Sequence, residues 1–332
     1  ICSPACVNQA GLCSDGLLCC ALARYRLALS SKRMLQLVPA LPVEAPSTWF
    51  GGVGSHNVEA LAGWLQLVQQ SRDGSLIPLL SLNVDFRAAV ISDRLLGDLE
   101  DHAQEREVPL HVWEALPRLL RCVEAARLCI KGLGLPDGAD PAPFVRVSRY
   151  ICAGVNRFSS LKYLDLALPC LRTGAGELFH ARLDSSFPCL ASLSFAVADC
   201  GTGLGTAAVL TLGSMPKLRT LTVANLGQGG WVVPTETLPV LGSIVVVDSC
   251  PRVADLICFP AVSNLTLCAR MRSGDTVYGE ELRGCSPLAS LAELRLVTVQ
   301  GGHNGEFPLC SALQVELDFF EEEGVHVDVM LV

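Results

Sequence analysis

An apolar phrase recurs along this chain: one apolar residue is followed three, six and eight positions later by further apolar residues, often after an opening Phe-Pro or Leu-Pro. A repeat of this kind predicts a solenoid, because each unit can bury its apolar side only against neighbouring units. The clear copies are Leu76-Leu79-Leu82-Val84, Phe158-Leu161-Leu164-Leu166, Phe187-Leu190-Leu193-Phe195, Met215-Leu218-Leu221-Val223, Leu238-Leu241-Ile244-Val246, Phe259-Val262-Leu265-Leu267 and Leu288-Leu291-Leu294-Leu296.

The distribution of the phrase predicts a domain order. We expect an irregular N-terminal cap over residues 1–75, degenerate repeats and helices over 76–145, the main repeats over 146–317 and a C-terminal cap over 318–332. The N-terminal cap should hold one helix that starts after Asn57, since residues 58, 61, 62, 65 and 68 are apolar and fall on one helical face.

Further elements follow from local signals. Helices are expected over 92–106 and 111–120, and a weaker copy of the phrase follows at Leu120-Val123-Ala126-Leu128. Residues 132–143 are rich in Gly and Pro, which predicts a loop. The long intervals between later repeats have room for helices over 176–183 and 206–212. A last degenerate phrase is expected over 309–317, and a strand over 325–332.

The phrase Phe-Pro-x-Leu-x-x-Leu-x-Leu, as in residues 187–195, and the run from Leu238 to Val253 resemble leucine-rich repeats of the irregular kind. The likeness covers residues 158–317 well and 76–130 faintly. It implies an α/β solenoid with a curved parallel sheet on its concave side and helices and turns on its convex side. The family's ladder of Asn or Cys after each strand is mostly missing. Cys250 holds such a place, and Asn225 lies near another.

Side chains alternate along a strand, so the residues between the apolar positions of the phrase should face outward along the concave sheet. The partner-binding residues predicted there are Tyr163, Asp165, Ser192, Ser194, Thr220, Thr222, Ser243, Val245, Asn264, Thr266, Glu293 and Arg295.

The central part of this stripe carries no charge. Small uncharged side chains cost little to desolvate, which favours a surface that is covered by a partner or by a terminal segment of the chain itself. The alternative is that Ser, Thr and Val are simply good strand formers.

Composition limits the function classes. Half of the 332 residues are hydrophobic and 17% are charged, below the roughly 25% of an average soluble domain, which indicates a surface hidden in a larger assembly. The net charge is −8, and no basic cluster stands out beyond Ser31-Lys32-Arg33, so direct nucleic-acid binding is not expected. No apolar run has the length of a transmembrane segment, and we expect none.

The cysteines have several interpretations. Most of the 16 stand singly at apolar positions or strand ends, such as Cys129, Cys152, Cys189 and Cys268, which favours free thiols. Residues 2–20 hold a group that could be free, disulfide-bonded or zinc-bound, although their spacing lacks a C-x-x-C pair. We predict no metal site and no cofactor.

No catalytic constellation is visible. The six histidines are scattered and none stands in a recognisable nucleophile or metal-binding motif, so no catalytic residue is predicted and the protein is not expected to be an enzyme. The stretch Gly51-Gly-Val-Gly-Ser-His56 superficially resembles a phosphate loop. In such a loop Lys follows the last Gly directly and a hydroxyl residue comes next, whereas Ser55 and His56 hold those places here, which argues against nucleotide binding.

The sequence therefore predicts a non-catalytic protein-binding scaffold, a structural or accessory subunit of a larger assembly, whose partners are other protein subunits rather than small molecules. The alternative is a substrate-recognition adaptor or ligand sensor of the same repeat type. The chain begins at Ile1, and removal of a targeting segment is one explanation. An intracellular location is expected, with the mitochondrion or another organelle interior favoured slightly over the cytosol.

Overall fold

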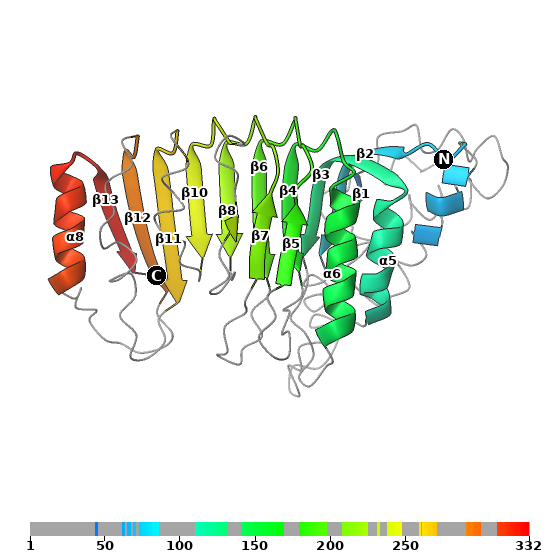
Figure 1. The fold of residues 1–332 in the computed structure, drawn as a ribbon, viewed down its shortest axis with the longest axis horizontal. Coiled ribbons are helices and arrows are strands. Elements are labelled where there is room, and N and C mark those ends of the chain that lie inside the picture. The colour runs from blue at the N-terminus through cyan, green and yellow to red at the C-terminus, as the bar shows by residue number, and fades with distance from the viewer. Residues whose placement is uncertain are drawn as a thin grey trace, which may run out of the picture. The chain divides into compact units, whose positions relative to one another are not determined.

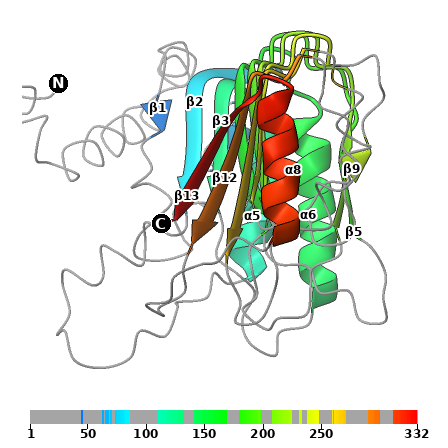
Figure 2. The ribbon, with the colours of Figure 1, turned by 90° about the vertical axis from the view of Figure 1, so that its left-hand side faces the viewer.

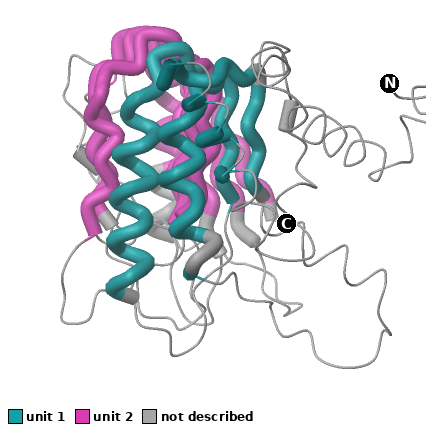
Figure 3. The backbone as a smooth tube through the Cα atoms, turned by 90° about the vertical axis from the view of Figure 1, so that its right-hand side faces the viewer, with its two compact units in different colours: residues 1–161 teal, residues 162–332 magenta. Residues whose placement is uncertain are grey.

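The computed structural model describes residues 44–45, 62–63, 65–67, 69–70, 73–85, 110–131, 141–168, 179–197, 208–224, 231–232, 238–247, 259, 261–270, 290–299 and 311–331. The chain is α/β with a large parallel sheet (Figure 1). It divides into two compact units, Ile1–Leu161 and Lys162–Val332, which Figure 3 colours separately.

Unit 1 pairs three parallel strands and packs two helices beside them. The strands are β1 (Glu44–Ala45), β2 (Ile77–Asp85) and β3 (Val123–Lys131), in that order. The helices α5 (Leu110–Leu120) and α6 (Pro141–Val155) lie side by side (Figures 1 and 3). Their buried faces include Trp113, Leu116, Phe144, Ile151 and Val155.

The predicted helix over 111–120 is confirmed by α5. Within the helix predicted after Asn57, the described residues 62–63, 65–67 and 69–70 are helical, and Ala62 and Leu65 are buried as expected. The helix predicted over 92–106 lies outside the described residues.

The loop predicted over 132–143 extends too far, because α6 already begins at Pro141. Proline is compatible with the first turn of a helix, where its missing N–H would have no intrahelical partner. The two prolines in this turn therefore mark the start of a helix and do not prevent it. Residues 132–140 lie outside the description.

Unit 2 contains the in-register repeats. Its main sheet runs β4 (Tyr163–Leu168), β6 (Ser192–Val197), β8 (Thr220–Ala224), β10 (Ser243–Val247), β11 (Asn264–Arg270), β12 (Glu293–Val299) and β13 (His326–Leu331), with all neighbours parallel. The helix α8 (Ser311–Glu322) precedes β13. The strand predicted over 325–332 is confirmed by β13. The degenerate copy of the phrase predicted over 309–317 is wrong, because the described part of that range belongs to the helix α8.

Where the structure describes the long intervals, their residues form strands. β5 (Phe179–Leu183), β7 (Ala208–Leu212) and β9 (Trp231–Val232) form a second parallel sheet, so the helices predicted over 176–183 and 206–212 are wrong. In β5 the apolar residues Phe179, Ala181 and Leu183 are buried and the residues between them are exposed. This alternation with a period of two is typical of a strand. It is a stronger signal than the length of the interval, from which a helix was predicted.

The core of unit 2 lies behind the main sheet. Figure 2 shows β5, β9 and α8 on the same side of that sheet. In the described copies of unit 2 the apolar positions of the phrase are buried, whereas Leu76 and Leu79 of the copy in unit 1 are partly exposed. In one copy, for example, Met215, Leu218 and Leu221 have no exposed surface. The prediction that these positions point into the core is confirmed for unit 2.

Backbone hydrogen bonds tie each repeat to the next. The N–H groups of Leu190, Leu218, Leu241 and Val262 each donate to the carbonyl three residues earlier, which closes a turn inside the phrase. The carbonyls of Lys162, Ala191, Arg219, Gly242 and Ser263, each just before a main-sheet strand, all accept two N–H groups from the following repeat. The loops after the strands, including Asn225 and Cys250, lie outside the described residues.

Candidate protein-binding surface

The outward residues of the main sheet in unit 2 form continuous rows across its strands. We call this surface the outer sheet face. It is the side opposite to β5, β9 and α8 (Figure 2). Its first row runs Tyr163, Ser192, Thr220, Ser243, Asn264, Glu293 and His326. Its second row runs Asp165, Ser194, Thr222, Val245, Thr266, Arg295 and Asp328.

All twelve residues predicted for the binding stripe lie in these two rows. The structure therefore brings together side chains that are spread over about 130 positions of the sequence. The strands β4 to β12 place them opposite one another because the phrase has the same internal spacing in every repeat. The sequence did not anticipate that β13 would extend the rows with His326 and Asp328.

A third row is almost entirely apolar. It consists of Ala167, Ala196, Ala224, Val247, Cys268, Val297 and Met330. Met330 is 41% exposed at the edge of the sheet. From β6 to β11, the first row of the outer sheet face therefore consists of small hydroxyl and amide side chains, and the third row consists of small apolar ones.

Within the three rows, the charged residues lie at the two ends of the face. Asp165 lies at the β4 end. At the β12–β13 end, Nη2 of Arg295 donates to Oε1 of Glu293 at 2.8 Å, and Nε donates to Oδ2 of Asp328 at 3.0 Å. Because these side chains are still about a third or more exposed, the ion pairs contribute at most about 1 kcal/mol each to stability. Between the ends, the rows from β6 to β11 contain no charged residue.

The size of the face can be judged from sheet geometry. Neighbouring strands lie about 4.8 Å apart, so the rows extend about 29 Å from β4 to β13. A standard protein interface buries about 800 Å² on each partner, which is more than a patch of this length and a few residues' width offers. A stable partner would therefore contact the outer sheet face and adjoining surface as well.

The described cysteines, Cys122, Cys129, Cys152, Cys189 and Cys268, form no disulfide bond, in agreement with the thiol interpretation. Burial raises the pKa of Cys122, and nearby Arg121 and Arg157 only partly oppose this. Its sulfur lies 3.4 Å from the carbonyl oxygen of Arg118. A raised pKa leaves less of the reactive thiolate, which lowers the reactivity of this buried thiol. Cys250 and the cysteines of residues 2–20 lie outside the described residues.

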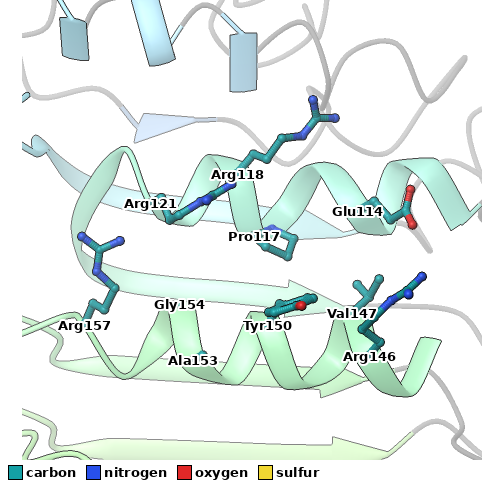
Figure 4. A pocket seen from close by; sticks show the side chains of 10 residues that line it. All are labelled: Glu114, Pro117, Arg118, Arg121, Arg146, Val147, Tyr150, Ala153, Gly154 and Arg157. Carbon is teal, nitrogen blue, oxygen red and sulfur yellow. The ribbon is translucent and has the colours of Figure 1, made fainter. Parts of the chain in front are cut away.

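One feature of unit 1 was missed by the sequence analysis, which found no basic cluster beyond Ser31-Lys32-Arg33. The helices α5 and α6 enclose an open groove with a volume of about 470 Å³, lined by Glu114, Pro117, Arg118, Arg121, Arg146, Val147, Tyr150, Ala153, Gly154 and Arg157 (Figure 4). A signal was present in the sequence: most lining residues recur at intervals of three or four positions, as at 114, 117 and 121 and at 146, 150, 153 and 157, and so fall on one side.

Two further observations bear on chemistry. Within the described ranges, no group of three or more His, Cys, Asp or Glu side chains could hold a metal ion. Among the helices that the structure describes, none has the length and apolar character needed to cross a membrane.

Comparisons of the chain with protein-family models, with curated proteins and with solved structures found no match.

Proposed function

We propose that this chain is a non-catalytic protein-binding scaffold of the leucine-rich-repeat type, a structural or accessory subunit of a larger protein assembly. Its outer sheet face is the surface that a partner covers. A leucine-rich-repeat solenoid accounts for the buried positions of the phrase, for the in-register parallel strands and for the paired hydrogen bonds between successive repeats.

The observation that carries this proposal is the uncharged centre of the outer sheet face. A face left to water usually carries Lys, Glu and Arg, whereas the rows from β6 to β11 carry Ser, Thr, Asn, Val, Ala and Cys. Removing water from such side chains costs far less than removing it from charged ones, and their small size lets a partner's backbone approach. A neutral face of this length supports a docking role.

The proposal is tested by placing a long charged side chain at the centre of the face. Thr222 is partly exposed on β8, with Ser194 and Val245 as its neighbours across the sheet. The variant Thr222→Arg should lower the yield of co-purified partner proteins at least about tenfold, because a buried unpaired guanidinium costs more than 1.4 kcal/mol. Native purification followed by quantitative mass spectrometry measures that yield.

Ser214→Arg is the matched control, since Ser214 is exposed and lies before β8, away from the rows of the outer sheet face. This variant should keep the partners. Circular dichroism and thermal melting establish that both variants are folded. Retention of every partner by a folded Thr222→Arg variant would contradict docking at this face.

A further inference from the structure

The groove between α5 and α6 combines a basic rim with an apolar floor. Figure 4 shows Arg121 and Arg157 at one end of the groove and Arg146 with Glu114 at the other. Pro117 and Tyr150 lie between these ends, and Val147 lies beside Arg146 (Figure 4). Arg118 also lines the groove, but Figure 4 shows its side chain extending away from α6.

The positive charge of the groove is local. The whole chain has a net charge of −8, while the groove gathers four arginines against one glutamate. Arginines are also favourable at helix C-termini, and Arg121 and Arg157 follow the last residues of α5 and α6. Two helix C-termini together supply only about −1 charge, so the two guanidinium groups leave this end positive. Arg146 lies near the start of α6, where the helix dipole gives no such explanation.

The floor of the groove is open to a ligand. Tyr150 is 58% exposed, an unusual state for a large aromatic side chain on a helix that packs against its neighbour. Gly154 allows the two helices to approach closely, because a Cβ atom there would lie 3.1 Å from Cβ of Leu120. The groove volume of about 470 Å³ falls in the range of about 300–1,000 Å³ that binding pockets occupy.

The distribution of the donors indicates the kind of ligand. A single phosphate group is held by several donors that converge on one point, whereas here the arginines stand at opposite ends of a groove with an apolar middle. The stretch from Arg146 to Arg157, most of which lies in α6, extends about 16 Å at about 1.5 Å per residue. A ligand that matches this arrangement is elongated, carries separated carboxylates and has an apolar side.

We propose that the groove between α5 and α6 binds an acidic amphipathic peptide segment of a partner protein. Carboxylates of that segment pair with Arg121 and Arg157, and its apolar side chains contact Tyr150, Pro117 and Val147. Guanidinium groups suit this role because their forked donors match the two oxygens of a carboxylate. The local positive charge of the groove attracts an acidic segment.

The test uses the full chain and a fluorescein-labelled peptide of about 12 residues built from Glu and Leu on opposite faces, which as a helix spans about 18 Å. Fluorescence anisotropy at low salt measures its binding. A second peptide with Gln in place of every Glu keeps the length and the apolar face. The wild-type chain should bind the Glu peptide at least about tenfold more tightly than the Gln peptide, and added salt should reduce the difference.

Variants locate the site. The double variant Arg121→Ala/Arg157→Ala should weaken binding of the Glu peptide about tenfold, and Tyr150→Ala should weaken binding of both peptides. Arg149→Ala is the matched control, because Arg149 is an exposed arginine of α6 that does not line the groove. It should bind like the wild type. Unchanged melting temperatures show that the losses arise from lost contacts.

The proposal is overturned if the Glu and Gln peptides bind equally, if the wild-type chain binds neither, or if Arg149→Ala loses as much affinity as the double variant. Displacement of the peptide by inorganic phosphate, but not by free glutamate at the same concentration, would also overturn it in favour of a phosphate ligand. These outcomes are independent of the Thr222 experiment, which concerns unit 2.

Discussion

At the scale of single residues, Glu124 shows how one side chain can organise a turn. Its Oε1 atom accepts from the backbone N–H groups of Ser159 and Ser160 at 2.8 and 2.7 Å, and from their hydroxyls at 3.3 and 2.8 Å. These residues lie inside the phrase that starts at Phe158, where the chain turns toward the next strand. Hydrogen bonds to a charged acceptor are stronger than those between neutral groups, so the carboxylate fixes this turn.

We therefore expect Glu124→Ala to lower the free energy of unfolding by about 1–2 kcal/mol, since it leaves two N–H groups to be satisfied by water. Glu124→Gln should lose less, because the amide oxygen still accepts. Ser159→Ala, which removes only the longest of the four bonds, is the control and should have a small effect. Urea denaturation measures all three. Equal stability of Glu124→Ala and the wild type would show that the turn forms without the carboxylate.

At the scale of the elements, the repeat is maintained by close backbone contact as well as by apolar burial. Gly213 follows β7, and its N–H donates to the carbonyl of Leu183 at 2.7 Å. A Cβ atom at this position would overlap the backbone carbonyl oxygens of Asp184 and Ser185. At Gly242 the nearest such atom, the carbonyl oxygen of Arg219, would lie 3.9 Å away.

This difference predicts opposite outcomes for two equal substitutions. Gly213→Ala should lower the free energy of unfolding by about 3 kcal/mol, because the backbone of the preceding repeat must move. Gly242→Ala should be neutral or stabilising by up to about 1 kcal/mol, since alanine restricts the unfolded chain. Its equivalents in two other repeats are already Ala191 and Ala292. Thermal melting of both variants measures the difference, and similar losses at both sites would refute the steric argument.

At the scale of the whole molecule, the two units offer different kinds of surface. Unit 2 presents the long neutral outer sheet face, and unit 1 presents a basic groove. Both surfaces suit protein partners, but through different physics: low desolvation cost in the first and charge pairing in the second. The low share of charged residues, 17%, is consistent with a chain that hides much of its surface in an assembly.

A partner on the outer sheet face should protect Cys268, a partly exposed residue of its third row. In the native assembly, modification of Cys268 by iodoacetamide should be at least about tenfold slower than in the isolated chain, because the reagent needs access to the thiolate. Cys189, also partly exposed but outside the rows, is the internal control and should keep its rate. Mass spectrometry of the two peptides gives both rates. Equal labelling of Cys268 in both forms would contradict coverage.

The repeats and the outer sheet face could be read from the sequence because they depend on local periodicity. The spacing of Met215, Leu218 and Leu221 determines which side chains are buried, and Thr220 and Thr222 must then face outward. The second sheet was not predicted because the length of the interval between two repeats was taken to favour a helix. The alternation of apolar and polar residues in β5, which is typical of a strand, was given less weight. The helix α6 was missed because prolines were taken only as breakers.

The sequence alone determined that the repeats stack with parallel strands and that neutral rows form across them. This is because every repeat has the same spacing of apolar and outward residues within a few positions. Only the tertiary structure decided which distant residues come together: Arg121 and Arg157 line one groove, Glu124 binds Ser159 and Ser160, and Gly213 lies against the backbone of Asp184 and Ser185. Those contacts depend on how whole elements pack, and packing is set by the combined shape of many side chains and not by any local pattern.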